Sequence, residues 1–250
     1  MVSRDKAAPF FAGWDETMIW SYLQGYMGRA VADDDENPSA VQIILGDFCF
    51  FAGKPCAELA ARAAAPILVP KDGAWSETIE KVWGADVERA TRYAIKKEPG
   101  VFDTGRLARY AGSLPEPYTL RLFDREIYDS TLRESWSSDF CSQFESYEAF
   151  SRRGTGVAVL FQGRPVAGAS SYTVYSGGIE IEIDTKPEFR QKGLATACGA
   201  RLILECLKRG LYPSWDAVDL RSVALAEKLG YHMDHPYPVY VKKRAVPDRG

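Results

Sequence analysis

The sequence predicts a mixed α/β protein with a mixed sheet. A hairpin comes first along the chain, and a further strand then leads through a tight loop into a helix. Three observations predict this class. Residues 157–174 carry the pattern of a β-hairpin with Gly163-Arg164 as its two-residue turn, residues 179–185 alternate strictly between apolar and acidic side chains, and residues 194–206 place apolar side chains at helical spacing. With 250 residues, 46% of them hydrophobic, the chain can build a core in one large domain or two small ones.

The first half of the chain has the character of a small α/β domain and carries no chemical motif. The acidic run Asp33-Asp34-Asp35-Glu36 is followed by Asn37-Pro38, which is typical of a solvated loop, so we assign it no metal site. The expected elements are an amphipathic helix, two buried strands and an alanine-rich helix, at residues 15–27, 41–45, 48–51 and 56–65.

A stretch rich in proline and glycine marks the expected domain boundary. Residues 112–117 contain one glycine and two prolines, which forbid a continuous helix and weaken any strand. We therefore expect an N-terminal α/β domain of unknown role over residues 1–117. A second domain, which carries the chemistry, is expected over residues 118–250.

Composition and charge argue against several functional classes. A formal net charge of -3 without a run of lysine and arginine argues against nucleic-acid binding. The first sixteen residues show no sustained apolar stretch behind a basic start, and nowhere do eighteen apolar residues run together, so we expect neither export nor a membrane span. Five scattered cysteines without a C-x-x-C pair suit a cytoplasmic protein that has no zinc site. The oligomeric state, monomer or homodimer, stays open.

The loop after residue 185 has the properties of a phosphate site. A helix N-terminus presents unpaired N–H groups and a partial positive charge, and small residues let a ligand approach the backbone closely. Residues 186–210 contain six basic and two acidic residues, a local charge of +4. The alternative is that Gly193, Ala195 and Gly199 only permit tight helix packing and that the basic side chains are solvated.

Short motifs that follow one another give this region a family resemblance. Arg190-x-x-Gly193-x-Ala195 resembles the coenzyme A motif of the GNAT superfamily of N-acetyltransferases, and Thr185-x-Pro187 looks like the end of that family's fourth strand. Downstream, Asp219-x-x-Ser222 leads to Leu229-Gly230-Tyr231, which is similar to the family's later strand–helix segment. The two-part layout also looks like a GNAT subgroup that includes zwittermicin-type antibiotic acetyltransferases.

The resemblance covers residues 118–243, most strongly residues 179–231, and it implies a GNAT acyltransferase fold in the second domain. It also implies an N-acetyltransferase that uses acetyl-CoA and transfers the acetyl group, within a ternary complex, to a primary amine of a small polar molecule. In the family, backbone groups of the fourth strand bind the pantetheine, and N–H groups of the loop bind the pyrophosphate. By position, the cofactor-binding residues are Ile183, Asp184, Thr185, Arg190, Gln191, Lys192, Gly193, Leu194, Ala195, Thr196, Asp219 and Ser222.

The reaction needs a neutral amine, so we expect a base near the acetyl group. Glu182 and Glu180 lie in the strand that, by the resemblance, reaches the acetyl group. Either carboxylate could accept the ammonium proton, directly or through water. They share one face of the strand unless a bulge intervenes. The alternative is that both lie on a solvated outer face.

Two positions depart from the family pattern. Asp219 stands where many members have an asparagine, and its carboxylate cannot donate to the cofactor, although it can cap a helix. Ala226 stands where many members have the tyrosine that protonates the departing thiolate. Without that tyrosine, the thiolate leaves unaided, which a low thiol pKa allows, or another hydroxyl donates the proton. The candidate donors are Ser222, Tyr231, Tyr237 and Tyr240.

Other interpretations of the sequence stay open. A protein amine could replace the small molecule as acceptor, or the chain could be a catalytically idle coenzyme A-binding or scaffold module. A cysteine hydrolase built on Cys141 or Cys198 lacks a histidine-containing motif near either thiol. His232 and His235 could serve as bases or lie on the surface. A further group could line an acceptor pocket or belong to the core, namely Trp136, Glu145 and Tyr147.

Overall fold

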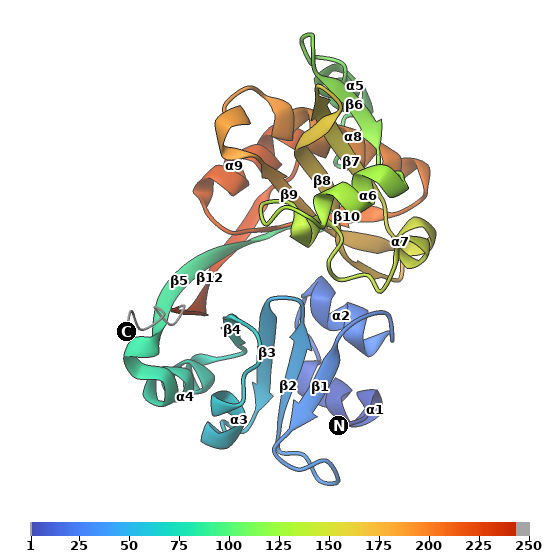
Figure 1. The fold of residues 1–250 in the computed structure, drawn as a ribbon. Helices are drawn as coiled ribbons and strands as arrows, with labels where there is room; N and C mark the ends of the chain where they lie inside the picture. Colours follow the sequence, from blue (N-terminus) through green and yellow to red (C-terminus); the bar gives the residue numbers. More distant parts are fainter. Residues whose placement is uncertain (1, 244–250) are drawn as a thin grey trace. The chain divides into compact units, whose positions relative to one another are not determined.

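The computed structural model describes residues 2–243, which form two compact units. Unit 1 contains the residues up to Arg92 and those from Pro236 onward, and unit 2 contains Tyr93–His235 (Figure 1). Two strands, β5 (Val87–Ile95) and β12 (Met233–Lys242), belong in part to each unit. The predicted mixed α/β class is confirmed. The boundary expected after residue 117 falls within unit 2 and, as a division into domains, stays a prediction.

Unit 2 is built on a five-stranded sheet with the order β10-β9-β8-β7-β6. Strands β6 to β9 pair antiparallel with their neighbours, whereas β10 runs parallel to β9. The strands therefore form a mixed sheet, as predicted. Their bounds are Thr119–Leu122 (β6), Gly156–Phe161 (β7), Arg164–Tyr175 (β8), Gly178–Thr185 (β9) and Tyr212–Ser214 (β10).

The β7–β8 hairpin turns one residue earlier than the sequence predicts. Gln162 and Gly163 form the turn, with φ angles of 50° and 76°, and Arg164 already belongs to β8. Positive φ at both central residues is the property of a type I′ turn, whose twist matches that of the flanking strands. In β9 Ile179 and Ile181 are buried in the core, as the alternation predicts, but Glu180 between them is buried as well.

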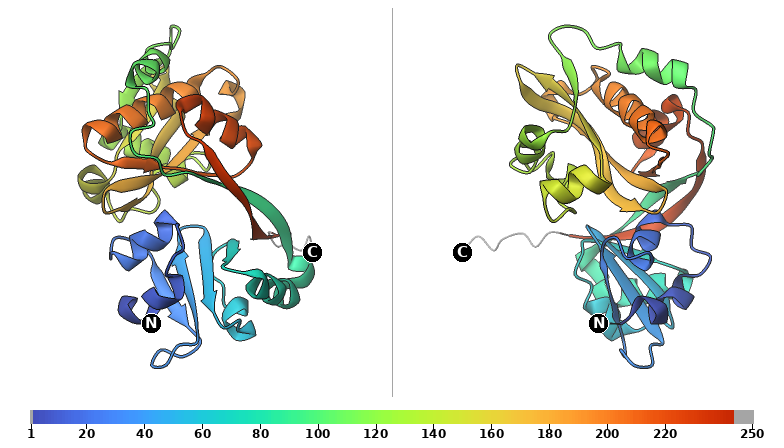
Figure 2. Two further views of the ribbon diagram at one scale, coloured as in Figure 1. Left: turned by 180° about the vertical axis from the view of Figure 1, so that it is seen from behind. Right: turned by 90° about the vertical axis from the view of Figure 1, so that its right-hand side faces the viewer.

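Helices cover both faces of the unit 2 sheet (Figure 2). Helix α8 lies on one face, and α6, the 3₁₀ turn η3 and α7 lie on the other. Helix α8 approaches helix α9 closely because Gly199 has no side chain, and a Cβ there would lie 2.7 Å from Cδ1 of Leu229, the last residue of α9. The bounds are Thr104–Ala111 (α5), Arg125–Thr131 (α6), Ser138–Phe140 (η3), Tyr147–Arg153 (α7), Pro187–Phe189 (η4), Leu194–Lys208 (α8), Asp216–Ala217 (β11) and Leu220–Leu229 (α9).

Unit 1 contains strands β1, β2, β3, β4 and the end of β12, which pair in that order. Only β3 and β4 are parallel. Helix α2 is shorter than the expected 15–27, since Gly25 and Gly28 adopt positive φ after it. The bounds are Arg4–Ala7 (α1), Ala8–Phe11 (η1), Thr17–Leu23 (α2), Arg29–Ala32 (β1), Ala40–Leu45 (β2), Phe48–Gly53 (β3), Ala57–Ala61 (α3), Ile67–Pro70 (β4), Gly73–Trp83 (α4) and Gly84–Asp86 (η2).

The two units repeat one order of elements. An antiparallel hairpin (β2–β3 in unit 1, β8–β9 in unit 2) is followed by a helix (α3, α8), a strand parallel to the second hairpin strand (β4, β10) and another helix (α4, α9). In unit 1 the parallel pairing extends along the whole of β4, from Ile67 to Pro70. The two units are therefore similar in topology, although the sequence motifs do not show this similarity.

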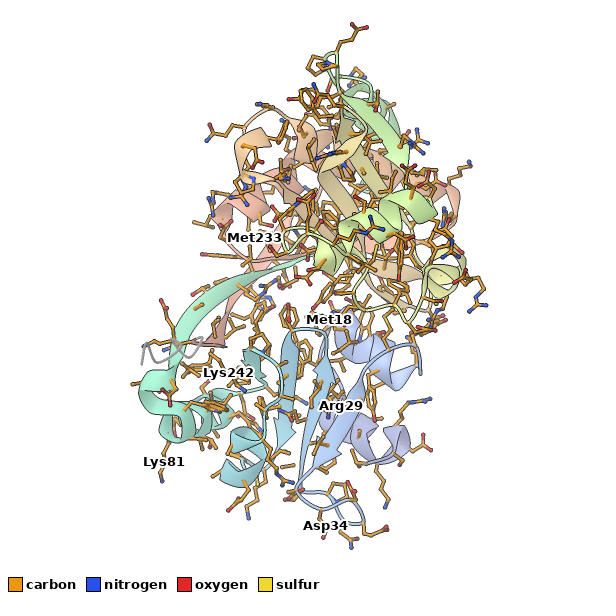
Figure 3. All side chains as sticks on the ribbon, in the orientation of Figure 1. Met18, Arg29, Asp34, Lys81, Met233 and Lys242 are labelled. Carbon is orange, nitrogen blue, oxygen red and sulfur yellow. The ribbon has the colours of Figure 1, made fainter. Side chains whose placement is uncertain are left out.

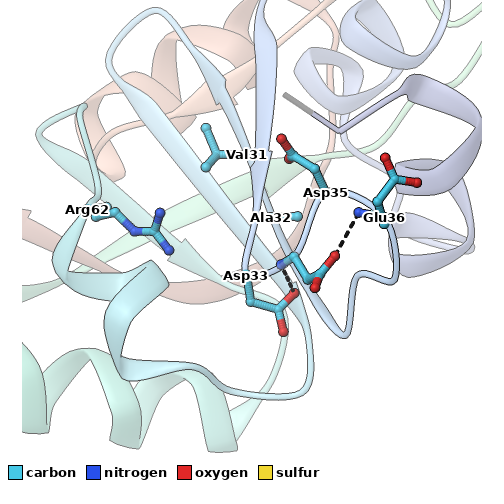
Figure 4. A pocket seen from close by; sticks show the side chains of 7 residues that line it. Val31, Ala32, Asp33, Asp35, Glu36 and Arg62 are labelled. Atoms are coloured by element: carbon cyan, nitrogen blue, oxygen red, sulfur yellow. Dashed lines mark hydrogen bonds between the residues drawn. The ribbon is translucent and has the colours of Figure 1, made fainter.

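The acidic run of residues 33–36 forms the loop between β1 and β2, with Asp34 at its tip (Figure 3). Its carboxylates bind the loop's own backbone. Asp33 accepts hydrogen bonds from the N–H groups of Ser39 and Ala40. Within the acidic run, the N–H of Asp34 donates to Asp33 and the N–H of Glu36 donates to Asp34 (Figure 4). Burial raises the pKa of Asp33, but the hydrogen bonds outweigh this effect and lower the pKa to about 2. The run thus stabilises the loop conformation.

Gln42 in β2 provides a test of the unit 1 core. The side chain is fully buried, and neither amide atom has a hydrogen-bond partner among residues 2–243. An unsatisfied buried polar group costs about 1–3 kcal/mol. We expect Gln42→Met, which keeps the volume and removes the amide, to raise the free energy of unfolding by about 1–2 kcal/mol in urea denaturation.

Ile44→Met is the matched control, since Ile44 lies on the same face of β2 and belongs to the apolar core cluster. It should leave the free energy of unfolding unchanged or slightly lower. A Gln42→Met variant that is less stable than the wild type would show that the amide makes a stabilising contact.

Candidate functional site

Strand β9 is paired along both edges only in its first three residues. On one side β8 pairs with it as far as Thr185. On the other side β10 pairs only with Gly178, Ile179 and Glu180. Beyond Ser214 the chain leaves this sheet, because the next strand, β11, pairs with β5. We call the point between Glu180 and Ser214, where β9 and β10 separate, the fork.

The edge of β9 beyond the fork runs to the loop that precedes α8. Over residues 181–185 it faces no partner strand on the β10 side, within the part of the chain that the structure describes. Backbone N–H and C=O groups on such an edge can hydrogen-bond to an extended ligand. The edge and the loop together are therefore the candidate binding surface.

The loop before α8 presents a helix N-terminus. Gln191 and Gly193 both adopt the left-handed region, with φ angles of 62° and 79°, and Gly193 is the N-cap residue of α8. Leu194 is buried and anchors the first turn. The N–H groups of the first helical residues, Leu194, Ala195 and Thr196, have no acceptor within the helix. Binding of an anion by these groups stays a prediction.

Arg190 ties this loop to the end of β9. Its Nε donates to the carbonyl oxygen of Thr185 at 3.0 Å, and its guanidinium lies 3.3 Å from the Asp184 carboxylate. Lys192 lies over the ring of Phe189, with Nζ 5.0 Å from the ring centroid. The predicted strand-end residues and the predicted loop residues thus come together. Arg190 has a structural contact that the sequence did not predict.

Glu180 and Glu182 lie on the same face of β9. The irregularity in this part of the sheet falls on β8, between Ser171 and Thr173, so β9 keeps its alternation. Glu180 is only 5% exposed, which contradicts a solvated outer face for this residue. Glu182 is half-buried. Both carboxylates face the side of the sheet that η3 covers, opposite α8.

Two hydroxyl groups meet at the fork without any signal in the sequence. Tyr175 Oη, from β8, and Ser214 Oγ, from β10, lie 2.8 Å apart in a hydrogen bond. Ser214 is the register partner of Glu180 on the neighbouring strand. The tyrosine reaches across β9 because Gly178 has no side chain, and a Cβ there would lie 2.2 Å from Tyr175 Oη. Only the pairing of three strands places these groups together.

The start of α9 is a capped helix N-terminus. Asp219 is its N-cap residue and accepts hydrogen bonds from the N–H groups of Arg221 and Ser222, both at 2.9 Å. These bonds to the backbone, first that of Ser222, lower the pKa of the Asp219 carboxyl. Ser222 Oγ in turn accepts a hydrogen bond from Trp215 Nε1 at 3.1 Å. A contact of Asp219 or Ser222 with a cofactor stays a prediction.

Two of the tyrosines considered as proton donors, Tyr231 and Tyr240, donate hydrogen bonds to other protein groups. Tyr231 is buried and donates to the carbonyl oxygen of Pro213 at 2.7 Å, and burial raises its pKa well above the usual value. Tyr240 Oη donates to Glu80 at 2.5 Å, within unit 1. Tyr237 also belongs to unit 1. The Tyr231 hydroxyl thus lies next to the fork, at Pro213, but it is committed to that carbonyl oxygen.

The cysteine hydrolase hypothesis has no support in the thiols. Cys141 and Cys198 are buried, and burial raises the pKa of each to about 12. Such thiols stay protonated at neutral pH and are poor nucleophiles. Within residues 2–243, no group of histidine, cysteine and acidic side chains is arranged to hold a metal ion.

The remaining candidates lie mostly on the surface. His232 is exposed and contacts Glu98, with 2.7 Å between Nδ1 and Oε2. His235 is exposed and contacts Asp234. Trp136 packs edge-on against Phe140 on the Glu182 side of the sheet, and its Nε1 donates to Glu134. Glu145, in the bend before α7, pairs with Arg153, and Tyr147, the first residue of α7, packs against Tyr128 and Arg125.

Comparison with known proteins identifies the family. The family model for GNAT acetyltransferases matches residues 8–240. An uncharacterized N-acetyltransferase of Bacillus subtilis (strain 168), YdfB, is 26% identical over 241 residues, which cover 90% of this chain and 89% of that protein.

Solved structures agree with this result. The crystal structure of a GCN5-related N-acetyltransferase-like protein from Streptococcus suis 89/1591 is 44% identical and has a TM-score of 0.92, over 96% of this chain and 98% of that chain. A GCN5-related N-acetyltransferase from Kribbella flavida, at 16% identity and a TM-score of 0.57, shares the fold over 91% of this chain and 95% of its own.

One negative finding accompanies these results. In the part of the chain that the structure covers, no helix combines the length and the apolar character needed to cross a membrane.

Together with the fold, the family match over nearly the whole chain confirms the resemblance that the motifs predicted. The chain belongs to the GNAT acetyltransferase family, and it is an acetyltransferase.

Proposed function

We propose that unit 2 binds acetyl-CoA and transfers its acetyl group to a primary amine of a small polar molecule, in the cytoplasm. The observation that carries this proposal is the unpaired edge of β9, which joins the fork to the N-terminus of α8. A ligand with an extended arm and an anionic end fits such a surface. Acetyl-CoA has both features.

The cofactor is placed by its charge. The pyrophosphate binds at the N-terminus of α8, where N–H groups of Gly193 to Thr196 and the partial positive charge of the helix favour an anion. The pantetheine then lies along residues 181–185 of β9, with backbone hydrogen bonds at Ile183 and Thr185. Five residues of strand span about 16 Å, so the thioester end of the pantetheine reaches the fork.

The acidic face of β9 supports catalysis. Most amines are protonated at neutral pH, and a carboxylate near the thioester both attracts the ammonium group and accepts its proton. Glu180 lies at the fork itself, and Glu182 lies two residues closer to the loop. Position thus favours Glu180 as the base, with Glu182 as the alternative. Backbone N–H groups along the free edge stabilise the oxyanion of the tetrahedral intermediate.

Two alternatives remain to be tested. A protein amine could be the acceptor in place of a small molecule, and a screen of peptide and small-molecule amines would separate the two. A catalytically idle coenzyme A-binding module would bind acetyl-CoA without turnover. The buried carboxylate of Glu180 at the fork favours an active enzyme over this alternative, because a structural strand gains nothing from burying a charge there.

Gly193→Glu tests the pyrophosphate site. The new carboxylate would repel the pyrophosphate at the helix N-terminus, and we expect acetyl-CoA binding to fall below detection in calorimetric titration. The substitution leaves the fold intact, because a Cβ at Gly193 meets no atom within 4 Å. Its positive φ of 79° adds only a modest strain.

Gly163→Glu is the matched control, since Gly163 has a similar φ of 76° and also has open space around its Cα. It lies in the β7–β8 turn and should bind acetyl-CoA as the wild type does. Undiminished binding by Gly193→Glu would place the pyrophosphate elsewhere.

Glu180→Gln and Glu182→Gln test the base. We expect Glu180→Gln to lower turnover by about 10²-fold, mostly at low pH, because deprotonation of the amine becomes the difficult step. Affinity for acetyl-CoA should be unchanged. The comparison of pH–rate profiles decides between the carboxylates: a larger effect in Glu182→Gln moves the role to that residue, and unchanged profiles in both variants leave water as the base.

Asp219→Ala separates helix capping from cofactor binding. Loss of the cap should lower the free energy of unfolding by about 1 kcal/mol at neutral pH, with unchanged acetyl-CoA affinity. Because folding lowers the pKa of Asp219, the stabilisation is fully present above the usual aspartate pKa of about 3.9 and is lost as the pH falls through the lower folded-state pKa. The stability difference between variant and wild type should therefore vanish in acid, and a weaker affinity for acetyl-CoA would assign Asp219 to the cofactor site.

A further inference from the structure

The proposed reaction leaves a thiolate at the fork, and the family's usual tyrosine is absent there. Position 226 holds a buried alanine in α9. Tyr231, the nearest tyrosine along the chain, is committed to the carbonyl oxygen of Pro213. A proton donor, if the fold supplies one, must therefore come from another strand or helix.

The fork contains such a group in the hydroxyl pair of Tyr175 and Ser214. The two oxygens lie 2.8 Å apart, and both residues are buried, Ser214 to within 1% exposure. Burial restricts bulk water, so a proton needed there has to come from the protein. Ser214 is also the last residue of β10 that pairs with β9, so its side chain lies where the free edge of β9 begins.

We propose that Ser214, backed by Tyr175, is the proton donor to the thiolate of coenzyme A. This inference rests on the proposed function, since it places the thioester at the fork. When the C–S bond breaks, the sulfur takes the Ser214 hydroxyl proton, and Ser214 takes the phenol proton of Tyr175. The tyrosine is the acidic member, because a phenol has a pKa near 10 and an aliphatic hydroxyl is far less acidic.

The proton balance closes through Glu180. Glu180 first passes the ammonium proton to solvent. The neutral amine nitrogen then forms its bond to the acetyl carbon and loses a second proton, which the ionised Glu180 accepts. Glu180 is opposite Ser214 in the β9–β10 register, so its proton can return across the fork to the hydroxyl pair. Each cycle then ends with free thiol, amide product, neutral Tyr175 and ionised Glu180.

Other titratable groups near the fork are occupied. Tyr212 Oη donates to the carbonyl oxygen of Lys96 at 3.2 Å and accepts from the N–H of Glu98 at 2.9 Å. Burial, in the first place, raises its pKa. The Tyr175 hydroxyl also lies 3.5 Å from the carbonyl oxygen of Tyr212, a longer contact than its 2.8 Å bond to Ser214. The proposed proton transfer therefore follows the shorter bond, between Tyr175 and Ser214.

The test compares Tyr175→Phe, Ser214→Ala and the double variant with the wild type. Release of free thiol from acetyl-CoA is followed across pH, with the best amine of a panel or with water alone as acceptor. We expect each single variant to lower kcat by about 10- to 100-fold, with acetyl-CoA affinity within about twofold of the wild type. Tyr175→Phe should also lose the fall in rate at high pH that ionisation of the tyrosine causes in the wild type.

The double variant provides a second criterion. Residues that act as one relay are not additive, so the double variant should be no slower than the worse single variant. Multiplicative losses would mean that the two hydroxyls act separately, which overturns the relay.

Tyr231→Phe is the matched control. It removes a hydroxyl that is as deeply buried and that donates to the neighbouring residue of the same strand, β10. It should lower the unfolding temperature and leave both kcat and the pH profile unchanged. If Tyr175→Phe behaves like this control, the hydroxyl pair is structural and the inference is wrong.

The same measurements distinguish failure of the proposed function from failure of the relay. A wild-type chain that binds no acetyl-CoA, or binds it and releases no thiol with any acceptor, overturns the proposed function and the relay together. A wild-type chain that turns over, with both single variants as fast as the wild type, overturns the relay alone.

Discussion

The short parallel pairing between β9 and β10 is the constraint on which the candidate site depends. Three residues of each strand pair, and then β10 ends and the chain continues into another sheet. The separation leaves backbone groups of β9 without a strand partner at one edge while β8 still holds the other edge in place. A rigid strand with one free edge can receive an extended ligand without rearrangement of the backbone. The charges at the two ends of that edge then determine which groups of the ligand each end favours.

Opposite charges mark the two ends of that surface. At one end the left-handed conformations of Gln191 and Gly193 start α8, and the hydrogen bond from Arg190 to Thr185 fixes the loop to the strand. This end suits an anion. At the other end Glu180 is buried beside a serine and a tyrosine hydroxyl. This end suits a cation and the transfer of protons. Aminolysis of an anionic thioester cofactor by a protonated amine requires these two opposite environments.

The two units show how one order of elements gives different surfaces. In unit 1 the parallel strands β3 and β4 pair along the whole of β4, and the helix between them, α3, has five residues. In unit 2 the corresponding pairing covers three residues, and α8 has fifteen. Full pairing satisfies the backbone of β3 and leaves it little edge to offer. The length of the parallel pairing, more than the order of elements, decides which unit can bind a ligand in this way.

The sequence by itself determined the features that depend on neighbouring residues. The alternation in residues 179–185 specifies β9, and the loop from Arg190 to Thr196 specifies the start of α8, because side-chain period and backbone conformation are local properties. These features were sufficient for the fold class and the family. The hairpin turn was misplaced by one residue, since adjacent positions beside Gly163 offer similar turns.

Only the tertiary structure decided the features that depend on strand register. The fork, the burial of Glu180 and the meeting of Tyr175 with Ser214 arise because β8, β9 and β10, which are separated in sequence by up to 39 residues at this contact, pair in one particular register. Register is set by the packing of whole strands against α8 and η3, and no local motif encodes it. The sequence thus located the loop that we propose for the cofactor, and the structure located the hydroxyl groups that the sequence had left unassigned.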